Sequence, residues 1–179
     1  MITSPRLTDK RRYLAAQISV QKQERAEEGL DVGIDSLTGL MTEAGFLETG
    51  QYLLAVSLQL GLGVKALHID VQGFEQYSQR NGAAAGDRAL VEIAQALTAS
   101  FRGCDLIARI RECEFCVLLS AGPECALESR LQRLEEHLQR AHEKRMPELR
   151  FSIGKSMITY RPGEHGSLKQ LLTDARKRA

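Results

Sequence analysis

The amino-acid sequence predicts an α+β fold in which a central, mainly antiparallel sheet has helices packed around it. Apolar residues recur at helical spacing in two long segments, first at Leu90, Ile93, Ala94, Leu97 and Phe101 and then at Leu127, Leu131, Leu134 and Leu138. Short apolar runs typical of strands lie around these segments. With one helix ahead of them, the elements follow the order β-α-β-β-α-β, which is typical of such a sheet.

The first 30 residues differ in composition from the rest of the chain. From Thr8, a candidate N-cap, the segment is rich in charged residues and helix formers, and it ends at Gly29. Its few large apolar residues form too thin a stripe to assign a coiled coil: Leu14, Ile18 and Val20. We predict a helix or connector over residues 1–30 and one domain over residues 31–179. Whether the helix forms a homodimer stays open.

The domain begins with a helix and a strand that have clear boundaries. Thr42 is placed to cap a helix that continues to Leu60, because a threonine side chain can accept from the free N–H groups of the first turn. Glycines at positions 61 and 63 end this helix. The apolar run that follows predicts a strand over residues 64–70.

The stretch ARIRECEFCVLL, residues 108–119, predicts two apolar strands joined by an unusual turn. Tight two-residue turns favour Asn, Asp or Gly, because their central residues need positive φ. Here the turn carries Arg111 and Glu112, so we expect a different or longer turn. Beyond the next helix, the sequence predicts a fourth strand over residues 149–158 and a short helix from Ser167.

The charge balance excludes some classes of function. The chain has 24 Lys and Arg against 23 Asp and Glu, a formal net charge of +1, so no global field draws it to nucleic acid or to an anionic membrane. No apolar run approaches a membrane span, and the N-terminus has no apolar leader region. We therefore expect a cytoplasmic protein with no direct membrane insertion.

The four cysteines are expected to be reduced and to serve as small apolar side chains. Cys113 and Cys116 match a C-x-x-C pattern, but residues three apart on a strand point to opposite faces. The two thiols could share a zinc ion only if Cys113 lies in the turn.

Five short motifs follow one another along the chain: Asp35–Leu40 (DSLTGL), Ile69 and Asp70 with Phe74, Gly82 with Gly86 and Asp87, Arg102 and Asp105 with Ala108 and Arg109, and Ser152–Gly154 (SIG). Their order and spacing resemble those of the GGDEF family of diguanylate cyclases. The resemblance runs from about Asp35 to the C-terminus. It implies a polymerase palm-like fold, in which active members join two GTP molecules into cyclic di-GMP with two divalent cations.

The resemblance also implies that the active site is degenerate. In the family, two hairpin glycines let the main chain approach the nucleotide, and an acidic third residue holds metal. Here the hairpin reads RECEF, residues 111–115, so charged residues replace both glycines and Cys113 replaces the acid. Further departures are Gln72, Glu75 and Ser78. We interpret four residues as vestiges of the site and expect no catalysis, cofactor or metal: Asp70, Asp87, Cys113 and Glu114.

An inhibitory-site motif of the family, R-x-x-D, is retained at Arg102 and Asp105. In the family this motif binds cyclic di-GMP with a second arginine from the helix after the hairpin, and ungapped counting places Arg133 there. Arginine can donate to phosphate oxygens, and aspartate can accept from guanine N–H groups. Arg133 and Arg130 lie off the leucine stripe, so both are free to face a ligand. The predicted function is a cyclic di-GMP receptor.

Other interpretations stay open. One is a scaffold that binds no nucleotide and mediates dimerisation or docks a partner protein. Another is a repurposed metal site built from three residues on neighbouring strands: His68, Asp70 and Cys113. The vestigial residues also have ordinary structural explanations, in which Asp87 caps a helix over residues 88–101 and Glu114 is solvated.

Overall fold

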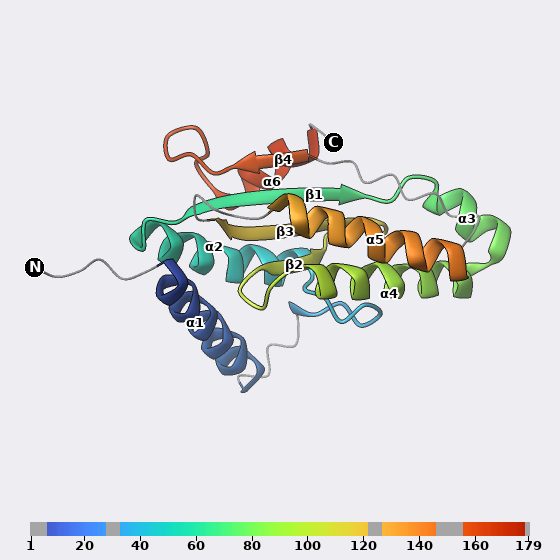
Figure 1. Ribbon diagram of the computed structural model, residues 1–179, viewed down its shortest axis with the longest axis horizontal. Coiled ribbons are helices and arrows are strands. Elements are labelled where there is room, and N and C mark those ends of the chain that lie inside the picture. The colour runs from blue at the N-terminus through green and yellow to red at the C-terminus, as the bar shows by residue number, and fades with distance from the viewer. Residues whose placement is uncertain (1–6, 28–32, 122–126, 146–155, 178–179) are drawn as a thin grey trace, which may run out of the picture.

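A computed structural model describes residues 7–27, 33–121, 127–145 and 156–177. Its helices are α1 (Leu7–Glu27), α2 (Glu43–Gln59), α3 (Phe74–Asn81), α4 (Ala83–Ser100), α5 (Leu127–Arg145) and α6 (Leu168–Lys177). Its strands are β1 (Gly63–Asp70), β2 (Leu106–Arg109), β3 (Glu114–Ala121) and β4 (Ser156–Thr159). Figure 1 shows the sheet at the centre, with helices in front and behind.

The strands form one sheet in the order β2-β3-β1-β4, and every neighbouring pair is antiparallel. The predicted α+β fold with a central antiparallel sheet is therefore confirmed. β1 lies between β3 and β4, with Asp70 opposite Glu114 and His68 opposite Ser156. This register brings the end of β1 beside the start of β3, where the turn of the β2–β3 hairpin ends. Most of the fourth strand predicted over residues 149–158 lies outside the described residues.

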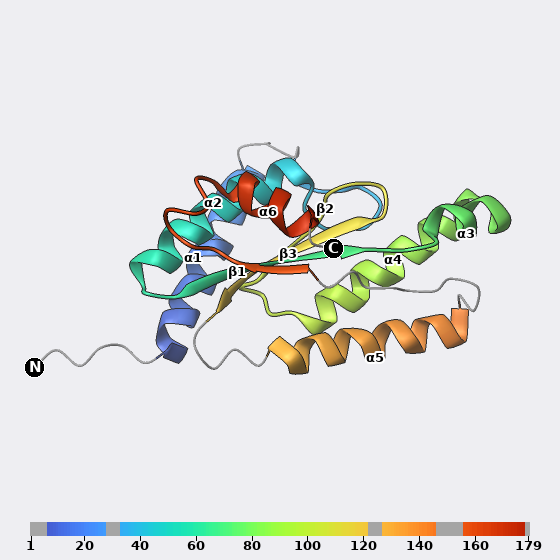
Figure 2. The same ribbon diagram turned by 90° about the horizontal axis from the view of Figure 1, so that it is seen from above.

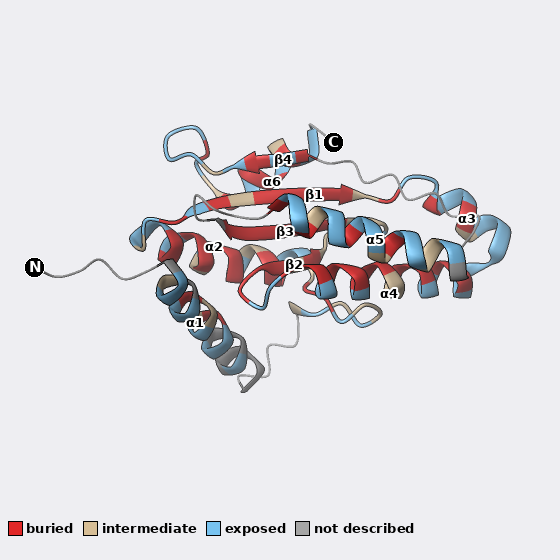
Figure 3. Cartoon of the chain, viewed as in Figure 1, coloured by how far each residue is buried: buried red, intermediate tan, exposed pale blue. Residues whose placement is uncertain are grey.

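Helices cover both faces of the sheet (Figure 2). α3, α4 and α5 lie on one face and contribute to a core with Phe115, Val117 and Leu119 of β3. α1, α2 and α6 lie on the other face and share a second core with Cys116 and Leu118. Because alternate residues of β3 enter opposite cores, the strand is apolar on both sides. Figure 3 shows β1 and β3 buried along most of their length, while the outer surface of α5 is exposed.

The start of α2 follows the sequence prediction. Oγ1 of Thr42 accepts a hydrogen bond from the N–H of Gly45 at 3.4 Å, which satisfies a free donor of the first turn. Met41, just before this cap, pairs with the outer edge of β2: its N–H donates to Ile107, and its carbonyl accepts from the N–H of Arg109 at 2.8 Å. The entry into α2 is thus anchored to the hairpin.

Two predicted helix starts are wrong. α4 begins at Ala83 rather than at residue 88, so Asp87 is an exposed residue inside the helix and does not cap it. The break before α4 is made by Gly82, whose φ of 86° lies in the region that favours glycine. Thr8 lies inside α1 and is not its cap.

α1 packs on the domain. Leu14 and Ile18 are fully buried in the core shared with α2 and α6. Polar contacts support this packing, because the hydroxyl of Tyr52 donates to Gln17 and the ammonium of Lys10 donates to the carbonyl of Leu60, each at 2.6 Å. Apolar burial on one side and two hydrogen bonds fix the direction of α1 against α2.

Candidate functional site

The hairpin tip has a longer turn than a two-residue hairpin. The last pair of the β2–β3 ladder is Arg109 with Phe115, and the N–H of Ile110 donates to the carbonyl of Glu114 at 2.8 Å. No non-glycine residue in the described part of the chain has positive φ. The expected longer turn is therefore confirmed, and it explains how Arg111 and Glu112 occupy the tip without strain.

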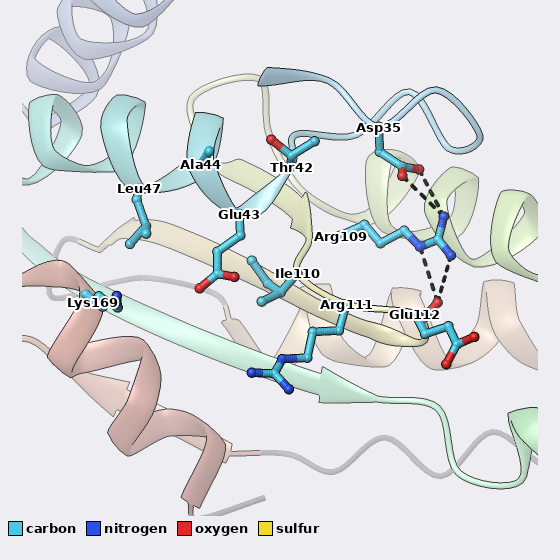
Figure 4. A pocket seen from close by; sticks show the side chains of 10 residues that line it. All are labelled: Asp35, Thr42, Glu43, Ala44, Leu47, Arg109, Ile110, Arg111, Glu112 and Lys169. Carbon is cyan, nitrogen blue, oxygen red and sulfur yellow. Dashed lines mark hydrogen bonds and ion pairs between the residues drawn. The ribbon is translucent and has the colours of Figure 1, made fainter. Parts of the chain in front are cut away.

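Arg109 connects this tip to the turn that carries Asp35. Its guanidinium donates to both carboxylate oxygens of Asp35 at 3.2 and 3.3 Å and to the carbonyl of Glu112 at 3.2 and 2.9 Å (Figure 4). Burial raises the pKa of Asp35, but hydrogen bonds from Thr38 and the charge of Arg109 outweigh this effect and hold that pKa below its usual value. The tip and the turn before α2 are thereby joined by an ion pair.

A cavity of about 730 Å³ lies between the hairpin tip, the first turn of α2 and the start of α6 (Figure 4). Ala44, Leu47 and Ile110 give it an apolar side. Its exposed charged side chains include Glu43, Arg111 and Lys169. The lining contains both signs of charge, so the cavity has no single electrostatic preference.

Glu114 lies at the centre of a partly buried polar cluster. One carboxylate oxygen, Oε1, accepts from Arg176 of α6 at 2.6 Å, and the other, Oε2, lies 3.2 Å from Nε2 of His68. The side chain of Glu114 is 14% exposed, so the expectation that it is solvated is wrong. The register of β1 with β3 places His68 and Glu114 on the same face of the sheet, which allows this contact.

Asp70 and Cys113 lie next to this cluster. The thiol of Cys113 is 3.8 Å from Oδ1 of Asp70, and burial, followed by the charge of Asp70, raises the pKa of that thiol. A protonated thiol is a poor ligand for Mg²⁺, which prefers oxygen. Among the described residues no group of three or more His, Cys, Asp and Glu could hold a metal ion. The donor set does not fit the divalent cations that the family's chemistry requires, and it does not support a zinc site with His68.

The aspartate of the R-x-x-D motif, Asp105, forms a buried ion pair with Arg130 of α5. Oδ2 of Asp105 accepts from Nη1 of Arg130 at 2.7 Å and from the N–H of Arg102 at 2.9 Å. The side chains of Asp105 and Arg130 are 0% and 3% exposed. The expectation that Arg130 is free to face a ligand is therefore wrong, because its guanidinium is paired with Asp105 inside the domain. Asp105 ties the loop after α4 to α5.

Two arginines of the predicted receptor site are exposed beside this ion pair. Arg102 follows the end of α4, and Arg133 lies one turn beyond Arg130 on α5. α4 and α5 pack side by side (Figure 2). In the described part of the chain, no ion pair occupies either guanidinium. Both guanidinium groups therefore lie on the elements that the buried ion pair joins, where the motif predicts a ligand.

Sequence reasoning missed the partners of two carboxylates, Asp105 and Glu114. Alternation along β1 places His68 on the face of Asp70, so its contact with Glu114 follows from the hairpin register. The contact with Arg176 depends on how α6 packs, for which the sequence carries no local signal.

None of the described helices is long and apolar enough to cross a membrane.

Comparisons with known proteins agree with this geometry. Residues 32–179 match the family described as "Diguanylate cyclase, GGDEF domain". Diguanylate cyclase TpbB of Pseudomonas aeruginosa is 37% identical over 86 residues, which are 48% of this chain and 20% of that protein. The chain spans about a fifth of the length of the curated relatives it matches.

Solved structures share the fold. A sensory box/GGDEF family protein from Caulobacter crescentus superposes with a TM-score of 0.70 at 24% identity, covering 82% of this chain and 94% of that chain. The GGDEF domain of DgcB from Caulobacter crescentus, solved in complex with c-di-GMP, has a TM-score of 0.70 at 16% identity and covers 82% of this chain and 87% of that chain. Since the family match covers residues 32–179, well over half of the chain, this chain belongs to the GGDEF domain family.

Proposed function

We propose that this domain is a catalytically inactive GGDEF domain that binds cyclic di-GMP through its R-x-x-D surface. Arg102 and Arg133 contact the ligand in this proposal, and Asp105 positions the surface from within. The observation that carries the proposal is the buried ion pair of Asp105 with Arg130, because it holds the loop of Arg102 against the helix of Arg133.

The contacts of the carboxylates beside the hairpin, Glu114 and Asp70, support the loss of catalysis. A divalent cation would need carboxylate oxygens at the start of the hairpin. Here the oxygens of Glu114 are engaged by Arg176 and His68, and the neighbouring Asp70 lies against a thiol. The guanidinium already supplies a positive charge to Glu114, so a metal ion would have to displace it.

The hairpin tip supports the same conclusion. Glycines at this point would let the main chain approach a phosphate, because they carry no side chain. Arg111 and Glu112 are both exposed there, and Arg109 fixes the turn that carries them. A nucleotide that approached as in active family members would meet these side chains first.

The two exposed arginines, Arg102 and Arg133, support ligand binding. Arginine donates in pairs to phosphate oxygens and stacks on planar rings, so two exposed arginines suit a cyclic dinucleotide. The GGDEF domain of DgcB, solved with c-di-GMP, is a precedent for this ligand on the same fold. Since the Asp105 carboxylate is buried, its contribution here is to fix the loop rather than to read guanine directly.

Titration with cyclic di-GMP tests the receptor function. Micromolar affinity corresponds to about −8 kcal/mol, and at one hundred times the Kd the folded state gains about 2.7 kcal/mol. For a domain of this size, that gain raises the Tm by roughly 5–10 °C. GTP should give almost no shift. Arg102→Ala and Arg133→Ala should abolish or weaken the shift, whereas Arg140→Ala, an exposed arginine on the same helix, should leave it unchanged.

Two results would contradict the proposal. If cyclic di-GMP gives neither a thermal shift nor calorimetric heat at high micromolar concentration, the receptor function is wrong and a scaffold role replaces it. If the protein turns GTP into cyclic di-GMP with Mg²⁺ or Mn²⁺ above a buffer control, the domain is active. We expect no turnover, and we expect Cys113→Asp alone to restore none, because the tip residues and Glu114 remain unsuited.

A further inference from the structure

A chain of polar side chains crosses from the surface into the core beneath α6. Arg176 is 45% exposed and donates to Glu114 at 2.6 Å. The other oxygen of Glu114 lies 3.2 Å from Nε2 of His68, whose side chain is only 4% exposed. The contacts therefore connect the last turn of α6, the start of β3 and the middle of the sheet.

Two buried polar atoms lie at the inner end of this chain. Within the described structure, Nδ1 of His68 and Oγ of Ser156 have no hydrogen-bond partner. His68 and Ser156 are directly opposite in the β1–β4 register, so their side chains share one face of the sheet. Buried polar groups almost always have a partner, because an unpaired one loses its hydration without compensation.

The contact with Glu114 determines what Nδ1 can do. An ionised carboxylate only accepts hydrogen bonds, and Arg176 keeps a cation beside this one. Nε2 of His68 must therefore carry a proton, and in the neutral imidazole this leaves Nδ1 as an acceptor. The hydroxyl of Ser156 can donate and accept. A molecule held between them must donate to Nδ1 and accept from, or donate to, Oγ.

We propose that the side chains of His68 and Ser156 hold one water molecule between them on one face of the sheet. This ligand completes a chain from Ser156 through His68 and Glu114 to Arg176, and the chain latches the end of α6 to the sheet. Water fits because an internal water bridges buried polar groups that have no direct partner, as Nδ1 and Oγ have none here. The latch needs no cyclic nucleotide, so it is independent of the receptor function.

Direct observation tests the ligand. A crystal structure that resolves ordered water should show one molecule within hydrogen-bond distance of both Nδ1 and Oγ. Long-range ¹H–¹⁵N correlation spectra should show the Nε2–H tautomer of His68. A direct hydrogen bond from Ser156 to His68, or the Nδ1–H tautomer, would overturn the proposal.

A substitution in β4 tests the same site in solution. Ser156→Val displaces the ligand and leaves Nδ1 unpaired, so the Tm should fall by about 2–12 °C. Thr159→Val introduces the same side chain at an exposed position of the same strand and should change the Tm little. An unchanged or higher Tm for Ser156→Val would show that the site is dry, and would overturn the proposal.

A double-mutant cycle tests whether the hydrogen-bonded side chains from Ser156 to Arg176 act together. If the groups act together, the Tm losses of Ser156→Ala and Arg176→Gln should not add, because either change breaks the same chain. Lys177→Gln, which removes an exposed neighbouring cation paired with Asp174, should add to Ser156→Ala. Additive losses in the Arg176 cycle would refute the latch. The thermal shift with cyclic di-GMP should persist in all these variants, so a failure of the latch is distinct from a failure of the receptor function.

Discussion

Replacing Asp105 by asparagine tests how much the buried ion pair contributes to the domain. Asparagine keeps the shape and an acceptor for the N–H of Arg102, so the variant mainly removes charge. It leaves the guanidinium of Arg130, 3% exposed, without its carboxylate 2.7 Å away. Breaking a buried pair in this way costs about 3–5 kcal/mol. At roughly 2–4 °C per kcal/mol, the Tm should fall by about 6–20 °C.

Thermal and urea unfolding of Asp105→Asn would measure this loss. Adding Arg130→Met should recover part of it, because the double variant no longer buries an unpaired charge. Glu136→Gln is the control, since it breaks an exposed pair with Arg140 on the same helix and should cost less than about 1 kcal/mol. A loss below about 1 kcal/mol for Asp105→Asn would refute the reasoning, because it would mean that the pair is hydrated.

Three other outcomes follow from the described contacts. Burial raises the pKa of Cys116 to about 12 from 9.0, so the protonated thiol stabilises the fold below pH 9 and this contribution is lost as the pH rises toward 12. The urea midpoint of the wild type should therefore fall faster than that of Cys116→Ala over that range. The pKa of Asp35 lies below 3.8, so its carboxylate contributes fully above that pH and its contribution is lost in stronger acid. Asp35→Asn should cost about 1 kcal/mol at pH 7, and the difference from wild type should shrink near pH 3. Gly45→Ala would place a Cβ 2.6 Å from the carbonyl oxygen of Gly33 and should cost at least about 1–3 kcal/mol in thermal melts, whereas Gly103→Ala has open space and should not.

The periodic elements of the fold could be predicted because each has one dominant period. The leucine stripe of α5 and the apolar runs of β1 and β3 each indicate their secondary structure locally. The sequence prediction missed α3 and the start of α4 at Ala83, because the boundary between the two helices depends on the backbone of Gly82 rather than on a change in polarity. Asp87 consequently looked like a cap although the helix starts earlier.

In the candidate site, too, features set within one helix could be predicted, whereas contacts between distant elements could not. Arg130 stands three residues after Leu127 and four before Leu134, so helical spacing places it at the edge of the buried stripe, a signal that the sequence prediction overlooked. Its partner could not be predicted in this way, because Asp105 lies on a separate loop. Contacts between elements distant in sequence depend on packing, which no local pattern encodes.

The pairing of Met41 with the outer edge of β2 has a consequence for self-association. An uncovered edge strand offers a row of free N–H and carbonyl groups to another chain. At β2 two of these groups are already taken by Met41, so edge-to-edge growth of the sheet from this side is blocked by the chain's own entry into α2. The opposite edge is β4, whose described part has only four residues, Ser156–Thr159, and offers a short template. A domain built in this way resists strand-mediated aggregation without needing charged residues along its edges.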